Sequence, residues 1–220
     1  MNRLIVAALC LFVAACGTSA PTTTTTTAPQ VDDAQAVAET FETYAKAVQA
    51  KDGATAVGVV TDKTVAEYDN LRKLALTATE QELAALVPSA RVLVYAMRGE
   101  LEASTVRTAT PEDLVKAAVE RDLVSAGSIA DVTLDKPAVN KDTSMARVLL
   151  DGEQAGAIFV FAREDGKWKF DSPGVFDLAD RELNGVRDQK NLSKEQLFEE
   201  VLVAKYGAAK AAEVRKPLGG

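Results

Sequence analysis

Apolar side chains recur with a helical period over the first half of the chain that follows residue 31. The earliest stretch has spacings of four, three and four residues along one face, at Val37, Phe41, Tyr44 and Val48. Asp32 with Gln35 forms a capping-box pattern at its start, and Gly53 is expected to end or kink the helix. The pattern therefore predicts an amphipathic helix at the beginning of the folded part.

Further helix starts are marked by a polar cap ahead of an apolar run. Such starts occur near Thr64, at Thr79 with Glu82, and at Thr110 before Pro111. Residues 90–97 would suit a strand or a helix, but Ser89 as a cap and Arg98 with Gly99 as a stop favour the helix. The middle of the chain is therefore expected to be helical up to about residue 127.

Beyond residue 128 the apolar positions alternate, which indicates strands. The expected strands cover residues 129–134, 146–150, 158–162 and 167–170. Residues 140–142, 152–156 and Asp165-Gly166 separate them as turns, so consecutive strands should pair as an antiparallel meander. The strand at 158–162 is almost wholly apolar and is expected to be central and covered on both faces.

Two helices are expected after the strands. A short one covers about residues 176–183, and a longer one begins at Ser193 with Gln196 and ends at Gly207. Residues 208–215 can add one or two helical turns. The chain shows neither an internal repeat nor a second linker, so residues 31–220 are expected to form a single α+β domain.

The first helix, together with the aromatic hairpin from Phe159 to Phe170, is similar to the nuclear-transport-factor-2-like (cystatin-like) superfamily. The resemblance covers residues 34–53 and 129–171. It implies a curved antiparallel meander sheet packed with the N-terminal helices into a cone-like shape. The helices in the middle and at the C-terminus are then additions of the kind found in actinobacterial members. The resemblance carries no reaction, because enzymatic members place His, Asp or Tyr inside the cone and the chain has no histidine.

Residues 1–15 have the pattern of a lipoprotein signal peptide. Arg3 provides a positive start, and residues 4–13 are an uncharged apolar run too short to span a membrane. Val13-Ala14-Ala15-Cys16 then resembles the bacterial lipobox. The resemblance implies cleavage after Ala15 and a diacylglyceryl group on Cys16. The alternative is a secreted protein in which Cys16 is an incidental free cysteine.

Residues 16–30 follow as a tether that contains six consecutive threonines and two prolines. Such a composition buries too little apolar surface to offset the entropy of ordering. A lipobox followed by a threonine-rich stalk is typical of Gram-positive and actinobacterial envelope lipoproteins. We therefore expect an extracytoplasmic protein that is anchored to the cell membrane by the lipid on Cys16.

Composition narrows the function by exclusion. The 25 Lys and Arg against 32 Asp and Glu give a net charge of −7 without a basic run, so no nucleic acid partner is expected. The chain has no histidine, which excludes Ser-His-Asp and Cys-His nucleophiles and His-ligated zinc. Phosphate-loop, dinucleotide-binding and EF-hand patterns are also missing. Neither a cofactor nor a resident metal is therefore expected, and the chain is not expected to be an enzyme.

Aromatic side chains are the candidates for lining a ligand pocket. They are Tyr95, Phe159, Phe161, Trp168, Phe170 and Phe176. Arg98 and Arg147 are candidates for holding an anionic head group at such a pocket. The alternative is that the aromatic residues form the ordinary core of the domain and that the arginines lie at its surface.

Acidic and basic residues near the last hairpin offer weaker candidates. Asp171, Asp177 and Asp180 could act as an acid–base pair or hold a hard cation, or simply be solvated, helix-capping carboxylates. Lys167 and Lys169 flank Trp168 and could face lipid or glycan, although charged edge strands also serve to block aggregation.

Three functions follow from these features. The leading hypothesis is a lipid-anchored module that binds an apolar or amphipathic envelope ligand or docks a membrane partner. The second is a non-catalytic structural accessory subunit of an envelope complex. The third is an enzyme that uses Asp and Tyr.

Overall fold

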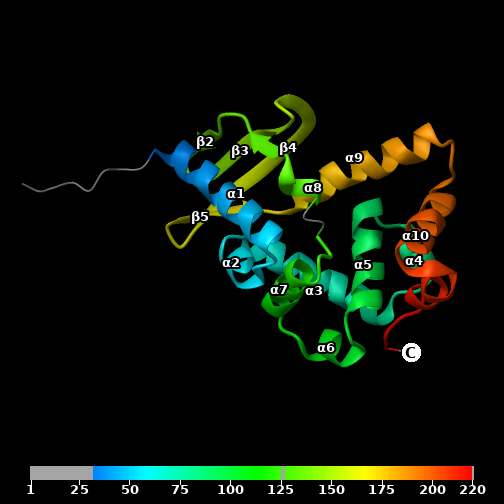
Figure 1. Cartoon of the computed structure of the whole chain (residues 1–220). Coiled ribbons are helices and arrows are strands. Elements are labelled where there is room, and N and C mark those ends of the chain that lie inside the picture. The colour runs from blue at the N-terminus through cyan, green and yellow to red at the C-terminus, as the bar shows by residue number, and fades with distance from the viewer. Residues whose placement is uncertain (1–31, 125–126, 220) are drawn as a thin grey trace, which may run out of the picture. The chain divides into compact units, whose positions relative to one another are not determined.

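A computed structural model describes residues 32–124 and 127–219 of the chain (Figure 1). The predicted signal peptide, the lipobox with Cys16 and the tether lie outside these residues. Within the described part, no helix combines the length and the apolar character needed to cross a membrane.

The described chain forms an α+β fold, as the sequence predicts, with helices before and after an antiparallel sheet. The helices are α1 Asp33–Ala50, α2 Gly53–Gly58, α3 Asp62–Thr77, α4 Glu80–Ala84, α5 Pro88–Glu100, α6 Ala103–Thr108, α7 Pro111–Glu120, α8 Gly127–Ala130, α9 Pro173–Gln189 and α10 Lys194–Val214. The strands are β1 Val132–Leu134, β2 Ala138–Asn140, β3 Thr143–Leu150, β4 Glu153–Glu164 and β5 Lys167–Asp171.

Local capping explains where most of the helices begin. The predicted capping boxes at the starts of α4 and α10 are both formed, and the Thr110 hydroxyl accepts the Asp113 N–H at the start of α7. The box expected at the start of α1 is wrong: Asp32 caps the helix through Ala34, while Gln35 donates to Glu39 instead.

Gly53 neither ends nor kinks α1. That helix ends at Ala50, where Lys51 takes a left-handed conformation with φ of 55°, and Gly53 begins α2. A Cβ at Gly53 would lie 2.6 Å from the backbone oxygen of Lys116 in α7. The glycine is therefore required by the close approach of α2 to α7.

The sheet is antiparallel and curved, with strand order β1-β3-β4-β5, while β2 pairs with β3 beside β1. Three sequence expectations are wrong here. Residues 129 and 130 belong to α8, β2 is an additional strand, and the β3–β4 turn is at Asp151-Gly152 because residues 153–156 extend β4. β4 is also not covered on both faces, since Ile158 is 50% exposed.

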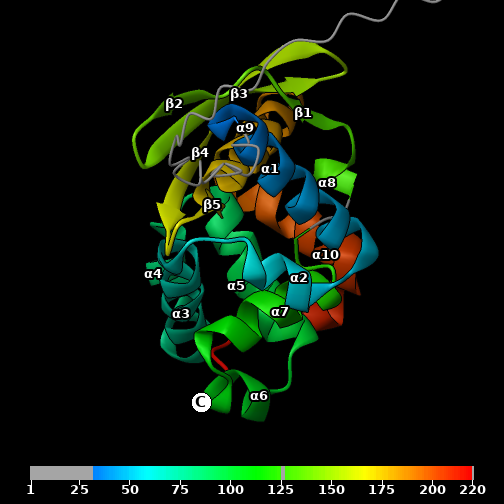
Figure 2. The ribbon, with the colours of Figure 1, turned by 90° about the vertical axis from the view of Figure 1, so that its left-hand side faces the viewer.

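One face of the sheet packs against α1 through a cluster of aromatic rings. Phe170 is its centre, with ring centroids 4.9–5.7 Å from those of Phe41, Tyr44, Phe159 and Phe161. The start of α1 is fixed to the same strands, because the Asp33 carboxylate accepts hydrogen bonds from Arg163 of β4 and Trp168 of β5. Figure 2 shows α1 lying along the sheet.

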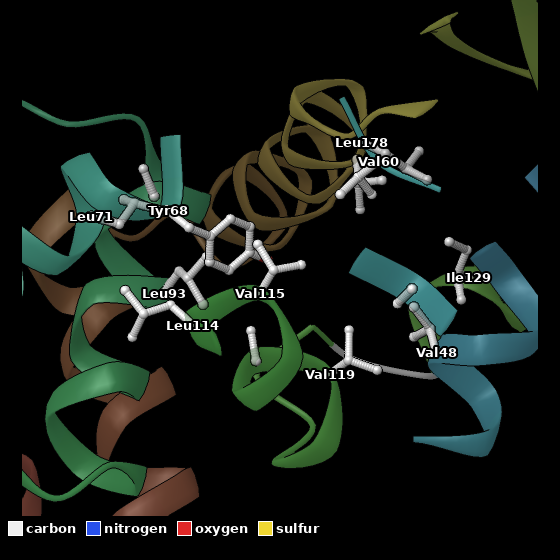
Figure 3. Close-up of a cluster of buried hydrophobic side chains, with 14 of the residues drawn as sticks. Val48, Val60, Tyr68, Leu71, Leu93, Leu114, Val115, Val119, Ile129 and Leu178 are labelled. Atoms are coloured by element: carbon white, nitrogen blue, oxygen red, sulfur yellow. The ribbon is translucent and has the colours of Figure 1, made fainter. Parts of the chain in front are cut away.

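A helical layer formed chiefly by α3, α5 and α7 continues the core away from the sheet. Figure 3 shows Tyr68 and Leu71 of α3, Leu93 of α5, and Leu114 and Val115 of α7 directed toward one another. α9 has 17 residues and is longer than predicted. α10 is interrupted by a kink at Gly207 and then continues to Val214, as the additional turns expected over residues 208–215 allow. α9 lies between the two parts, since it contacts both β4 and α5.

Candidate functional site

The predicted aromatic residues do not come together in one cavity. Phe159, Phe161 and Phe170 are completely buried in the ring cluster beneath α1, and Trp168 is buried at its edge. Tyr95 is buried in α5, where its ring lies 6.2 Å from that of Phe198. Phe176 alone of the six lies in α9 and is half-buried beside an open groove.

The two candidate arginines lie in different environments. The buried guanidinium of Arg98 donates to five backbone carbonyls, those of Leu74, Ala75, Ala78, Val214 and Arg215, at 2.6–3.5 Å. Those carbonyls belong to the C-terminal ends of α3 and α10, where the helix dipole favours a cation. Arg147 is exposed on β3, with Asp135 at 3.9 Å.

The three candidate aspartates also lie apart. Asp171 is buried and pairs with Lys63 at 2.7 Å, Asp177 is exposed, and Asp180 accepts the backbone N–H of Ser89 at 2.6 Å. Over residues 32–124 and 127–219, no three carboxylates or thiols are grouped as a metal would require. In β5, Trp168 faces inward while Lys167 is exposed, and Lys169 donates to the Gly58 carbonyl.

A groove of about 310 Å³ lies between α5 and α9, and Leu123 and Val124 also line it. Most of its walls are aliphatic or aromatic. The lining residues are Ser89, Val92, Leu93, Leu123, Val124, Val175, Phe176, Ala179, Glu182, Leu183 and Val186. The volume and the apolar walls match those of sites for small apolar ligands, which span roughly 300–1,000 Å³.

Ser89 gives this groove an unusual polar group. The sequence predicts Ser89 as the cap of α5, but Pro88 occupies the first helical position and Val87 is the N-cap. Asp180 of α9 takes the backbone N–H that a cap would bind. The Ser89 side chain is 6% exposed, and its Oγ has no hydrogen-bond partner within the described part of the chain. A buried hydroxyl without a hydrogen-bond partner lowers stability by about 1–3 kcal/mol. Ser89 therefore gives the groove wall a polar group that still lacks a partner among the residues that the structure describes.

A second hollow, of about 400 Å³, lies between α1 and the α8–β1 segment. Its rim contains Glu42 and Lys46, which pair with each other at 3.0 Å in solvent, as well as Gln49 and Thr133. No buried polar side chain without a partner lines it among the described residues. It therefore provides space but no group that would orient a ligand.

An ion-pair network that the sequence does not reveal fixes α5 on its other side. Arg91 is completely buried and pairs with Glu80 of α4 and Glu195 of α10, while its guanidinium stacks 4.1 Å from the centre of the Phe198 ring. Burial disfavours the charged form of Arg91, but the hydrogen bonds with Glu195, Tyr95 and Glu80 have the larger effect and raise the pKa of Arg91. Burial and the hydrogen bond to Glu80 raise the pKa of Tyr95 to about 12.

Comparison with models of protein families, with curated proteins and with solved structures finds no match to this chain. The fold and the groove describe an α+β domain with an apolar groove between two helices.

Proposed function

We propose that this protein is a lipid-anchored component of the bacterial cell envelope whose folded domain binds an apolar or amphipathic ligand in the α5–α9 groove. The apolar groove with the unpartnered hydroxyl of Ser89 is the observation that carries the proposal. Apolar walls provide affinity by removing ligand surface from water, and a buried polar group provides orientation.

Filling the groove with a larger side chain tests the binding proposal. A neutral fluorescent probe, N-phenyl-1-naphthylamine, is titrated into the full chain carrying Cys16→Ser, which removes the proposed acylation site. Ala179→Trp places a large ring in the groove, and Ala38→Trp makes the same change in the α1–β1 hollow. We expect the Ala179 variant to lose at least about tenfold in probe affinity and the Ala38 variant to bind normally.

The reverse result would assign binding to the α1–β1 hollow and overturn the assignment to the groove. Because Ala179→Trp can disturb packing, Val186→Glu provides a second variant at a residue that is 40% exposed in the groove wall. This variant should also lower the affinity for the probe, because it adds a carboxylate to an apolar surface.

The proposed anchor has its own test. Intact-protein mass spectrometry of material extracted from the host membrane should show a chain that begins at Cys16 and carries a covalent diacylglyceryl mass. An unmodified N-terminus elsewhere would contradict the anchor and leave the groove proposal standing.

A second candidate function is docking to another envelope protein as an accessory subunit. The observation that favours it is the uncovered face of the sheet, where Met145 is 55% and Ile158 is 50% exposed. The two residues lie on neighbouring strands and on the same face, since Met145 pairs with Val160 and Arg147 with Ile158.

A further inference from the structure

The polar groups of the α5–α9 groove restrict which amphiphile it can hold. Among its lining residues, Ser89 provides a hydroxyl and Glu182 a carboxylate, and none is a lysine or an arginine. The Ser89 Oγ is buried without a partner among the described residues, whereas Glu182 is exposed. A hydroxyl can both donate and accept a hydrogen bond, so Ser89 can pair with another hydroxyl.

An anionic head group would find no counter-charge among the described residues that line the groove. The N-terminus of α5 would ordinarily attract an anion, but the Asp180 carboxylate already occupies the Ser89 N–H, and Glu182 adds a second negative charge.

The arginines of α5 and α9 are directed to other partners. Arg91 pairs with Glu80 and Glu195, and Arg98 binds helix carbonyls. Arg187 pairs with Asp188, and the guanidinium of Arg181 lies beside Gly156 of β4. A carboxylate or phosphate entering the groove would therefore lose water without gaining a cation, which is costly.

On the basis of the proposed function, we infer that the groove selects an uncharged amphiphile with one short alkyl chain and a hydroxyl head group that pairs with the Ser89 Oγ. A volume of about 310 Å³ is at the small end of ligand pockets, which supports one chain rather than two. The hydroxyl head group satisfies the buried oxygen that the free protein leaves unpaired.

Three ligands of equal chain length test this specificity. Decanol, decanoate and decylamine are used near neutral pH to displace N-phenyl-1-naphthylamine from the full chain carrying Cys16→Ser. We expect decanol to displace the probe at a concentration at least about tenfold lower than decanoate, because the carboxylate would have to be desolvated beside Asp180 and Glu182. Decanol should also exceed decylamine: the exposed Glu182 attracts an ammonium group only weakly through water, while the ammonium loses hydration beside Ser89 and can only donate to its hydroxyl.

A pair of serine variants tests the role of Ser89 itself. Ser89→Ala should lower the affinity for decanol by about two- to tenfold, because it removes one hydrogen bond and little volume. Ser144→Ala is the matched control: Ser144 is equally buried, but it lies in β3 and its hydroxyl already donates to the Ala138 carbonyl. It should leave the preference for decanol unchanged.

The outcomes separate this inference from the proposed function. If neither the probe nor any of the three amphiphiles binds, the proposed function fails. If the probe binds but the three head groups compete equally, or decylamine is preferred, the inferred ligand class is overturned while the groove remains a binding site. If decanol is preferred but Ser89→Ala changes nothing, the assignment of the hydroxyl partner to Ser89 is overturned.

Discussion

Ser89 and Asp180 illustrate how one residue from a distant element can change the role of another. The sequence favours Ser89 as the cap of α5, but the carboxylate of Asp180 takes the backbone N–H, 91 positions away in the chain. Within the part of the chain that the structure describes, the Ser89 hydroxyl is left buried and unpaired. Its stability effect is therefore opposite to that of an ordinary cap, whose loss costs about 0.5–2 kcal/mol.

We expect Ser89→Ala to leave the free energy of unfolding unchanged or to raise it by up to about 2 kcal/mol, because the variant removes a buried group that has no partner. Ser144→Ala should lower it by about 0.5–1.5 kcal/mol, since that hydroxyl donates to Ala138. Urea unfolding of both variants measures the two signs. A loss of stability in Ser89→Ala comparable to that in Ser144→Ala would show that Ser89 has a partner after all.

Arg98 and Arg147 look alike in sequence but differ in what their removal should do. Arg98→Met leaves five helix-end carbonyls without their donors, so we expect a loss of about 3–5 kcal/mol. Arg147→Met, on the exposed face of β3, should change stability by no more than about 0.5 kcal/mol. Thermal and urea unfolding of the two variants provide the comparison, and equal losses would contradict the structural role of Arg98.

The ion pair between Glu195 and the buried Arg91 makes the stability of the fold depend on pH. The hydrogen bond from Arg91 holds the pKa of Glu195 below its usual value, although burial acts in the opposite direction. A carboxyl group with a depressed folded pKa stabilises the protein above its unfolded pKa of about 4.3, and this contribution is lost as pH falls through the folded pKa.

Glu195→Gln should therefore lower the melting temperature at neutral pH, and the difference from the parent should shrink in acid. Glu200→Gln, which removes an exposed pair with Lys190, is the control and should have little effect. Thermal melts over a range of pH measure this. A difference for Glu195→Gln that stays constant into acid would mean that the carboxylate charge does not stabilise Arg91.

At the scale of elements, local chemistry predicts helix starts well. The boxes at Thr79 and Ser193 and the cap at Thr110 need only neighbours within the same turn. The errors arise where a contact with residues distant in the sequence determines the local structure. β2 is a three-residue exposed strand that forms only because β3 is beside it, and Ile129 continues the alternating pattern although it lies in α8.

Gly207 determines the path of α10. Its backbone, with φ of 75° and ψ of 161°, lies in a region that only glycine enters readily, and the kink precedes the end of α10 that meets Arg98. Gly207→Ala should therefore destabilise the protein by about 1–3 kcal/mol.

Gly185 in α9 is the matched position, because it is exposed and a Cβ there would meet nothing within 4 Å. Gly185→Ala should stabilise the protein by about 0.5–1 kcal/mol through the higher helix propensity of alanine. Chemical denaturation of the two variants should thus give opposite signs. Stabilisation by both would mean that α10 can continue straight through residue 207 without loss.

At the scale of the whole fold, the core runs without interruption from the ring cluster under α1 to the layer of α3, α5 and α7. The described part should therefore unfold as one cooperative unit. Trp168, the single tryptophan, reports on the sheet, whereas far-ultraviolet circular dichroism reports mainly on the helices. Their urea midpoints should coincide, and two separated transitions would show that the sheet and the helical layer are independent.

The fold class could be predicted from the sequence, whereas the groove could not. Phe176 is a candidate lining residue and does line the groove, but Phe159 and Phe170, candidates on the same grounds, lie in the core. Periodicity shows which apolar residues share one face of a helix or strand. It does not show whether the side chains of the neighbouring element fill the space beside that face. The unpaired state of Ser89 depends on Asp180, so it becomes visible only in three dimensions.

The attachment of Asp33 to Arg163 and Trp168 determines how the domain would respond to mechanical force. A pull on the chain at residue 32 enters at the first turn of α1, and these two side chains transmit it to β4 and β5, which pair over five positions. α1 contributes no strand to the sheet, so once this attachment breaks the helix can peel from the rings turn by turn. The attachment of Asp33 is therefore the first contact on this path to be loaded, ahead of the ladder of the sheet.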